Sequence, residues 1–126
     1  MKQKLLLDYQ RAKLIENHVK EGDHAPVVKL FFPWEASKWL LSQLNPVDNV
    51  AFGLCDLGIG EPEMGYISLD ELMSIKGFGG LGIERDTSFK GDKPLTEYAN
   101  KAREEGRIVE RWKDEKETLL FESKQL

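Results

Sequence analysis

The chain has 126 residues, of which 40% are hydrophobic and 32% are charged, and its formal net charge is −4. This length fits one folded domain over residues 1–126, and the composition is typical of a soluble globular protein. No apolar run is long enough to cross a bilayer, and Leu5–Leu7, followed by Asp8, is too short for a signal-peptide core. We therefore expect a cytoplasmic protein without a membrane partner.

The negative charge is concentrated in the middle of the chain. Between Ala25 and Ile75 there are seven acidic residues and two basic ones, a local balance of −5. Nucleic-acid affinity comes from clustered lysine and arginine, so this distribution argues against nucleic-acid binding and favours a basic protein partner.

The residues that commonly bind metals are sparse. Cys55 is the single cysteine, which excludes an internal disulfide and a cysteine-based zinc site, and we expect a buried reduced thiol. His18 and His24 do not have the spacing of a helical metal pair, and we expect both at the solvated surface. The sequence thus predicts no metal and no cofactor.

The first half of the chain contains a predicted helix and three predicted strands. Apolar residues at helical spacing predict a helix over Leu5–Val19, and Val27–Phe32 is a strand-length run of β-branched and aromatic residues. Lys38–Leu44 fits two structures: its apolar residues suit one helical face, but Trp39, Leu41 and Gln43 also alternate along a strand. A turn cluster follows and Val50–Leu57 reads as the next strand, so a hairpin is favoured.

The stretch Glu63–Phe89 has the clearest local pattern. A strand should end at Ser68, which has capping-box spacing to Glu71 and begins a helix of about two turns. Gly77 is the expected left-handed stop, and the glycine-rich loop after it should be structural, because a phosphate-binding loop precedes its helix. Ile83–Phe89 then resumes an extended conformation.

The C-terminal third begins with the firmest helix prediction, Pro94–Glu105, which Gly106 should end. Arg107–Leu126 is alternately charged and fits either a second helix or a tail that frays beyond Ser123. Together these elements predict a single α+β domain, with an antiparallel sheet of about four strands covered by the N-terminal helix and the Pro94–Glu105 helix.

Glu84, Arg85 and Asp86 form the tightest polar cluster beside a loop. On a strand, Glu84 and Asp86 share one face and Arg85 points to the other. Two such carboxylates can bind a cation or divide acid and base roles, but exposed cross-strand ion pairs are the stronger interpretation. The candidate functional surface also includes Trp34, Trp39 and Tyr66. The tryptophans could form a binding rim, but in a chain of this size tryptophans are more often core residues.

Five pieces of the chain resemble a known family: FFPWEASKWLL, VAFGL, EMGYISLDEL, IKGFGGLGIERDTSF and KPLTE. In this order they are similar to the bacterial domain-of-unknown-function family twenty-nine fifty-eight, over roughly Val27–Tyr98. The resemblance implies a small α+β protein carried on plasmids, phages or integrated conjugative elements, with helical N-terminal and charged C-terminal additions. It implies no activity.

Two function hypotheses follow from these observations. The first is a non-enzymatic accessory or protein-interaction module of a mobile genetic element, because no catalytic residue set is evident. The second is a small hydrolase or metal-dependent enzyme that uses Glu84 and Asp86. Antirestriction by nucleic-acid mimicry is a weaker third, since a balance of −5 is dilute for a phosphate imitation. Nothing in the sequence indicates the oligomeric state.

Overall fold

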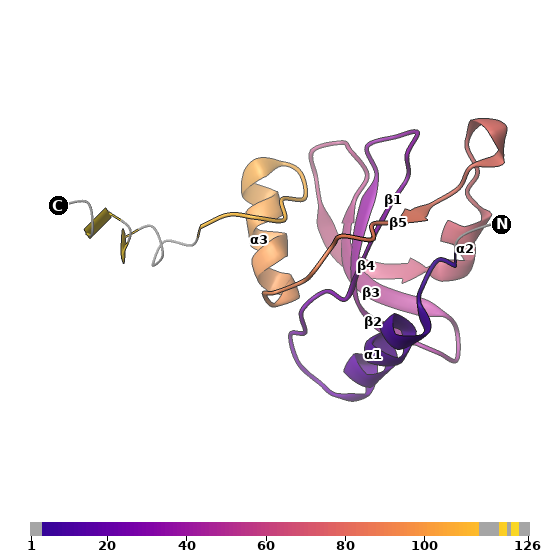
Figure 1. The fold of residues 1–126 in the computed structure, drawn as a ribbon, viewed down its shortest axis with the longest axis horizontal. Coiled ribbons are helices and arrows are strands. Elements are labelled where there is room, and N and C mark those ends of the chain that lie inside the picture. The colour runs from indigo at the N-terminus through magenta and orange to yellow at the C-terminus, as the bar shows by residue number, and fades with distance from the viewer. Residues whose placement is uncertain (1–3, 114–118, 121, 124–126) are drawn as a thin grey trace.

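The computed structural model describes residues 4–113, 119–120 and 122–123. Along residues 4–113, three α-helices and five β-strands follow one another (Figure 1). The helices are α1 (Asp8–Val19), α2 (Leu69–Ser74) and α3 (Leu95–Glu105). The strands are β1 (Val28–Phe31), β2 (Lys38–Asn45), β3 (Val50–Asp56), β4 (Glu63–Ser68) and β5 (Glu84–Arg85). One 3₁₀ turn, Phe78–Gly80, lies between α2 and β5.

The five strands form one antiparallel sheet in the order β4-β3-β2-β1-β5. This confirms the α+β class and the antiparallel pairing, with five strands where the sequence predicted about four. The fifth is the two-residue β5, inside the predicted extended segment Ile83–Phe89. Because β2 spans Lys38–Asn45, the strand interpretation of this segment is confirmed and its helix alternative is wrong.

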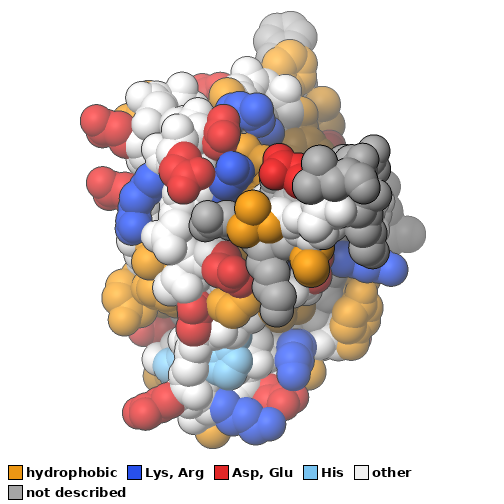
Figure 2. All heavy atoms as spheres, turned by 90° about the vertical axis from the view of Figure 1, so that its left-hand side faces the viewer, with side chains coloured by type: hydrophobic (Ala, Val, Ile, Leu, Met, Phe, Trp, Pro, Cys, Tyr) orange, Lys and Arg blue, Asp and Glu red, His pale blue; other side chains and the backbone are white. Residues whose placement is uncertain are grey.

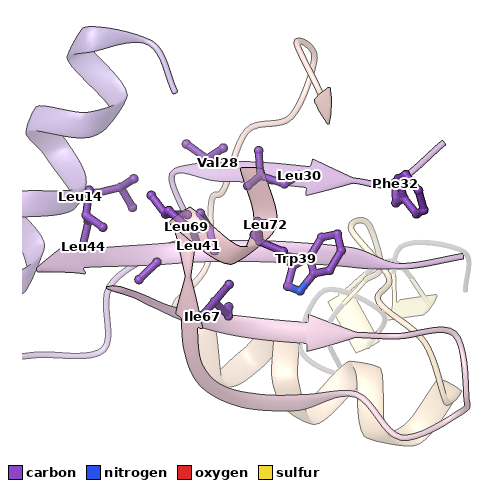
Figure 3. Packing of buried hydrophobic residues seen from close by; sticks show 11 residues of the cluster. Leu14, Val28, Leu30, Phe32, Trp39, Leu41, Leu44, Ile67, Leu69 and Leu72 are labelled. Carbon is purple, nitrogen blue, oxygen red and sulfur yellow. The ribbon is translucent and has the colours of Figure 1, made fainter. Parts of the chain in front are cut away.

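The sheet lies between two helical layers, with α1 and α2 on one face and α3 on the other (Figure 1). Alternation along β2 produces this arrangement: Trp39 and Leu41 join the core on the α1 side, and Leu40 joins the core on the α3 side. Figure 3 shows Leu14 of α1 packed above Leu44 of β2 in the first core. Each fully buried leucine contributes about 1.5–3 kcal/mol. The predicted covering by an N-terminal and a C-terminal helix is therefore confirmed.

The first turn of α2 is held by the predicted cap. Glu71 N donates to Ser68 Oγ at 3.2 Å, which satisfies one of the amides that a helix start leaves without a partner. The C-terminal end differs from the prediction. The helix is capped by the extended residue Ile75, and Gly77 has φ −94° and is not left-handed.

Gly77 serves packing rather than helix termination. A Cβ atom at this position would lie 2.3 Å from Cδ1 of the Trp34 indole, so only glycine allows the loop to approach the tryptophan. The left-handed conformations occur two and three residues later, at Gly79 and Gly80. Gly77 thus has a packing role within the glycine-rich loop.

The segment after α3 returns to the sheet. Gly106 ends α3 in the left-handed conformation with φ 72°, as predicted. Asp56, at the end of β3, then accepts hydrogen bonds from the amides of Gly58 and Ile108, at 2.9 Å each. Residues 107–113 are irregular, so the prediction of a second helix is wrong for this part. Residues 119–120 and 122–123 are helical. The tail expected beyond Ser123 lies outside the described residues.

Candidate functional site

The six candidate residues named from the sequence do not come together. Trp39 is a core residue, 5% exposed, and Arg85 is 8% exposed with its guanidinium donating to the carbonyl of Lys4. Trp34 lies on the β1–β2 loop and is 48% exposed, and Tyr66 lies on β4 and is 82% exposed. Of the three aromatic candidates, only Trp34 and Tyr66 offer large exposed surfaces, and they belong to different regions of the molecule.

Asp86 belongs to a partly buried ion-pair cluster. The Lys29 ammonium, on β1, lies 3.2 Å from Asp86 Oδ2 and 2.6 Å from Glu110 Oε2. Burial alone lowers the pKa of Lys29, but the hydrogen bonds and charges of Glu110 and Asp86 outweigh burial and raise it. Burial likewise raises the pKa of Asp86, but hydrogen bonds from Ser88 and Lys29 outweigh it and lower that pKa. Lys29 and Asp86 therefore both stay charged over a wider pH range than they would in isolation.

The two carboxylates proposed as a reactive pair have different surroundings. Glu84 is exposed, and its backbone lies opposite that of Phe31 in the sheet. Asp86 N donates to the carbonyl of Lys29 at 2.9 Å, which continues the same strand pairing. Side chains alternate along a strand, so both acids lie on the face opposite Arg85. The expected exposed ion pair is instead the partly buried pair of Asp86 with Lys29. Among the residues that the structure describes, no group of three or more His, Cys, Asp or Glu side chains is placed to hold a metal ion.

Two other residues differ in burial from the expectations. Cys55 is partly rather than fully buried, and burial, with the charges of Asp56 and Glu63, raises the pKa of its thiol despite a hydrogen bond from Trp39. His24 is also partly buried, with Nε2 at 2.6 Å from the carbonyl oxygen of Lys20. A thiol whose pKa is raised in this way is less reactive as a nucleophile.

One surface hollow, of about 390 Å³, lies where β1 meets the β1–β2 loop. Lys29, Lys38, Glu35 and Asp86 supply its charges, around the ring of Phe31. The two positive and two negative groups balance, and Lys29 is already held by two carboxylates. This hollow therefore has no evident preference for a ligand of either sign.

A second hollow of about 240 Å³ lies beside Tyr66, on the α3 side of the sheet. Tyr66 meets Phe52 of β3 edge to face, with ring centroids 5.3 Å apart. The other lining residues are polar or small and come from three elements and a turn: His18, Gln43, Asn45, Asp48 and Val50. Figure 2 views the molecule from the α3 side, where acidic, basic and hydrophobic side chains are interspersed.

A β-bulge brings Gln43 into this Tyr66 hollow. The pairing of β2 with β3 shifts between Leu41 and Gln43, and the intervening Ser42 is buried with its hydroxyl donating to the carbonyl of Phe52 at 3.3 Å. Gln43 consequently lies opposite Phe52, not on the face of Trp39 and Leu41 that simple alternation predicts. The sequence carries no clear signal for this bulge, so Gln43 was missed as a surface residue.

The strand that carries Tyr66 is the outer strand of the sheet. β4 pairs with β3 over six consecutive residues without a bulge, and no other described strand pairs with it. Leu69 N donates to the carbonyl of Asn49, so the alternating ladder directs the backbone groups of Gly65 and Ile67 toward β3. The backbone groups of the intervening Met64 and Tyr66 are thereby directed to the open side.

The segment of chain that contains this edge has no positive side chain, although Arg11 of α1 reaches its Asp70 end, where Nη1 donates to Asn49 Oδ1 at 3.4 Å. Residues 39–75 have six acidic side chains and no lysine, arginine or histidine. One of the six, Asp56, is buried, whereas Glu61, Glu63, Asp70 and Glu71 are exposed at the two ends of β4. The open edge of the sheet is therefore acidic at both ends.

Comparisons with known proteins give a family and no function. The family model described as "Protein of unknown function (DUF2958)" matches residues 5–109, a wider range than the Val27–Tyr98 resemblance and one that includes α1. Searches of curated proteins and of solved structures found no match. Within the described residues, no helix is both long and apolar enough to cross a membrane. Because the family model matches most of the length of the chain, the chain belongs to the DUF2958 family.

Proposed function

We propose that the chain is a non-enzymatic protein-interaction module, which binds an extended, basic segment of a partner protein along the outer edge of β4. The observation that carries this proposal is the open edge itself: six continuously paired residues whose outer backbone groups, at Met64 and Tyr66, have no neighbouring strand among the described residues. A strand added there gains main-chain hydrogen bonds, which is a common mode of peptide recognition.

The composition of β4 supports a docking role. Proteins normally protect an edge strand with lysine, proline, a bulge or a very short length. β4, Glu63–Ser68, contains no lysine or proline, and its register with β3 is regular. A Cβ atom at Gly65, in its middle, would meet nothing within 4 Å. An edge that lacks these protections and is sterically open suits the addition of a strand.

Charge selects the partner. In an antiparallel pair of two copies through β4, Glu61 and Glu63 of one copy would approach Asp70 and Glu71 of the other, and like charges across a strand pair are destabilising. A segment that carries lysine or arginine gains from the same charges. The proposal therefore favours a basic partner over self-association.

We also propose that the module is an accessory protein of a mobile genetic element and acts in the cytoplasm. The first point rests on the family resemblance alone, and the second on the sequence composition. The hydrolase alternative is less well supported, because Asp86 is engaged by Lys29 and Ser88, and no hydrogen bond or ion pair within residues 4–113 joins Glu84 to that cluster.

The test is calorimetric titration with a short synthetic peptide of alternating valine and arginine. Gly65→Lys should abolish binding, since it places a positive charge in the middle of the edge, whereas the matched variant Gly65→Glu should retain or strengthen binding. Gly65 has no left-handed φ and open space at Cβ, so both variants should fold, which thermal unfolding checks. Equal binding by wild type and Gly65→Lys would refute the proposal.

A further inference from the structure

We infer that the Tyr66 hollow is a binding site for the guanidinium group of an arginine side chain. This inference rests on the proposed function, because the arginine would belong to the segment that pairs with β4. The occupant is a side chain rather than a free metabolite. A volume of about 240 Å³ is below the range of about 300–1,000 Å³ that is usual for small-molecule sites.

The aromatic wall suits a planar cation. Tyr66 is 82% exposed, and its contact with Phe52 is an edge contact at an interplanar angle of 61°, so most of the tyrosine ring remains accessible. A guanidinium group stacks on such a ring, and aromatic faces attract cations through their quadrupole. Because Tyr66 is on the edge strand itself, a side chain from an added strand would reach its ring directly.

The polar wall supplies hydrogen-bond acceptors and one charge. Asp48 Oδ1 accepts a hydrogen bond from Val50 N at 3.1 Å, which fixes the carboxylate and leaves Oδ2 for a ligand. Among the described residues, the Gln43 side chain makes no hydrogen bond, so its carbonyl oxygen is a second acceptor. Guanidinium has five N–H donors in one plane and matches several acceptors at once, whereas an ammonium group is a single point charge.

Other planar occupants match the hollow less well. A nucleobase could stack on Tyr66, but its phosphate would lie beside the Asp48 carboxylate in a hollow whose lining has no lysine or arginine. A carboxylate ligand would face Asp48 without a lysine or arginine in the lining. Charge and shape together point to arginine.

The experiment compares two peptides of equal charge, alternating valine with arginine and valine with lysine. Wild type should bind the arginine peptide about three- to tenfold more tightly. Asp48→Asn keeps the acceptor for Val50 N but loses the charge, and should remove this preference, as should Tyr66→Leu. Tyr66→Phe, which keeps the ring, and Glu71→Gln, which removes an acid outside the hollow, should preserve the preference.

Each outcome separates the two proposals. Equal affinity for both peptides, with Gly65→Lys still blocking them, would overturn the arginine site and leave the docking edge intact. Failure of both peptides to bind would overturn both. Binding of single-stranded oligothymidylate to wild type, lost in Tyr66→Leu, would replace arginine by a nucleobase as the occupant.

Discussion

At one edge of the sheet, β5 pairs with β1 over two residues; at the other, β4 pairs with β3 over six. The β5 edge is short, and its charged side chains are engaged within the molecule. Arg85 is buried and donates a hydrogen bond to the carbonyl of Lys4, and Asp86 forms an ion pair with Lys29. The β4 edge carries neither a positive side chain nor proline, and its central Gly65 faces open space. One edge is thus closed by the chain's own contacts, and the other has no neighbouring strand in the described part of the chain.

The difference shows how the protein uses ion pairs. At the closed edge, Lys29 links three segments, β1, the residues after β5 and the segment after α3, through Asp86 and Glu110. At the open edge, the acids have no basic counterpart within residues 39–75. The paired charges at the closed edge stabilise the fold, and under the proposed function the acids at the open edge would attract a basic partner.

The largest expected effect is at the closed edge. Lys29→Met should lower the free energy of unfolding by about 1–3 kcal/mol, because it leaves the carboxylates of Asp86 and Glu110 partly buried without a cation. Chemical denaturation measures the change. Glu110→Gln, which removes one partner and keeps the Asp86 pair, should cost less, and a Lys29→Met variant as stable as wild type would show that the cluster does not hold this edge.

A smaller effect is expected at the end of the open strand. Ser68→Ala removes the acceptor for Glu71 N and should cost roughly 1 kcal/mol in a denaturation experiment. Ser68→Asp restores an acceptor at the same position and should recover most of the loss. An unchanged denaturation midpoint in Ser68→Ala would mean that the cap does not stabilise the junction of β4 and α2.

The Ser68 cap and the Lys29 cluster also show which features can be predicted from sequence and which cannot. The Ser68 cap and the left-handed Gly106 are local, and their residue types and spacing were sufficient to predict them. The Lys29–Glu110 pair joins positions 81 residues apart, a contact that only tertiary structure determines.

The candidate site was less predictable than the fold. Tyr66 was identified as a surface aromatic residue, but the bulge that turns Gln43 into its hollow leaves no pattern in sequence periodicity. The left-handed stop was assigned to Gly77 because helices often end this way, whereas that glycine is required by its contact with Trp34. In both cases a contact between distant segments overrode a local rule.

The pH dependence of the closed edge gives the smallest effect. The pKa of Asp86 is lowered from its ordinary value of 3.8, so its stabilising contribution is present above that value and is lost as the pH falls through the lower folded pKa. Wild type should therefore exceed Asp86→Asn in stability by under about 1 kcal/mol near neutral pH, and the difference should disappear in acid. Asparagine keeps an oxygen for the Ser88 amide. A difference that grows as the pH falls would contradict this assignment.

Amide hydrogen exchange on β4 tests the central claim most directly. In the free protein, the amides of Met64 and Tyr66 should exchange quickly, because they are directed to the open side, while those of Gly65 and Ile67 should be protected by β3. Addition of the valine–arginine peptide should slow exchange at Met64 and Tyr66 and leave their neighbours nearly unchanged. Protection of all four amides in the free protein, or no slowing when the peptide is bound, would contradict the account of β4 as the docking edge.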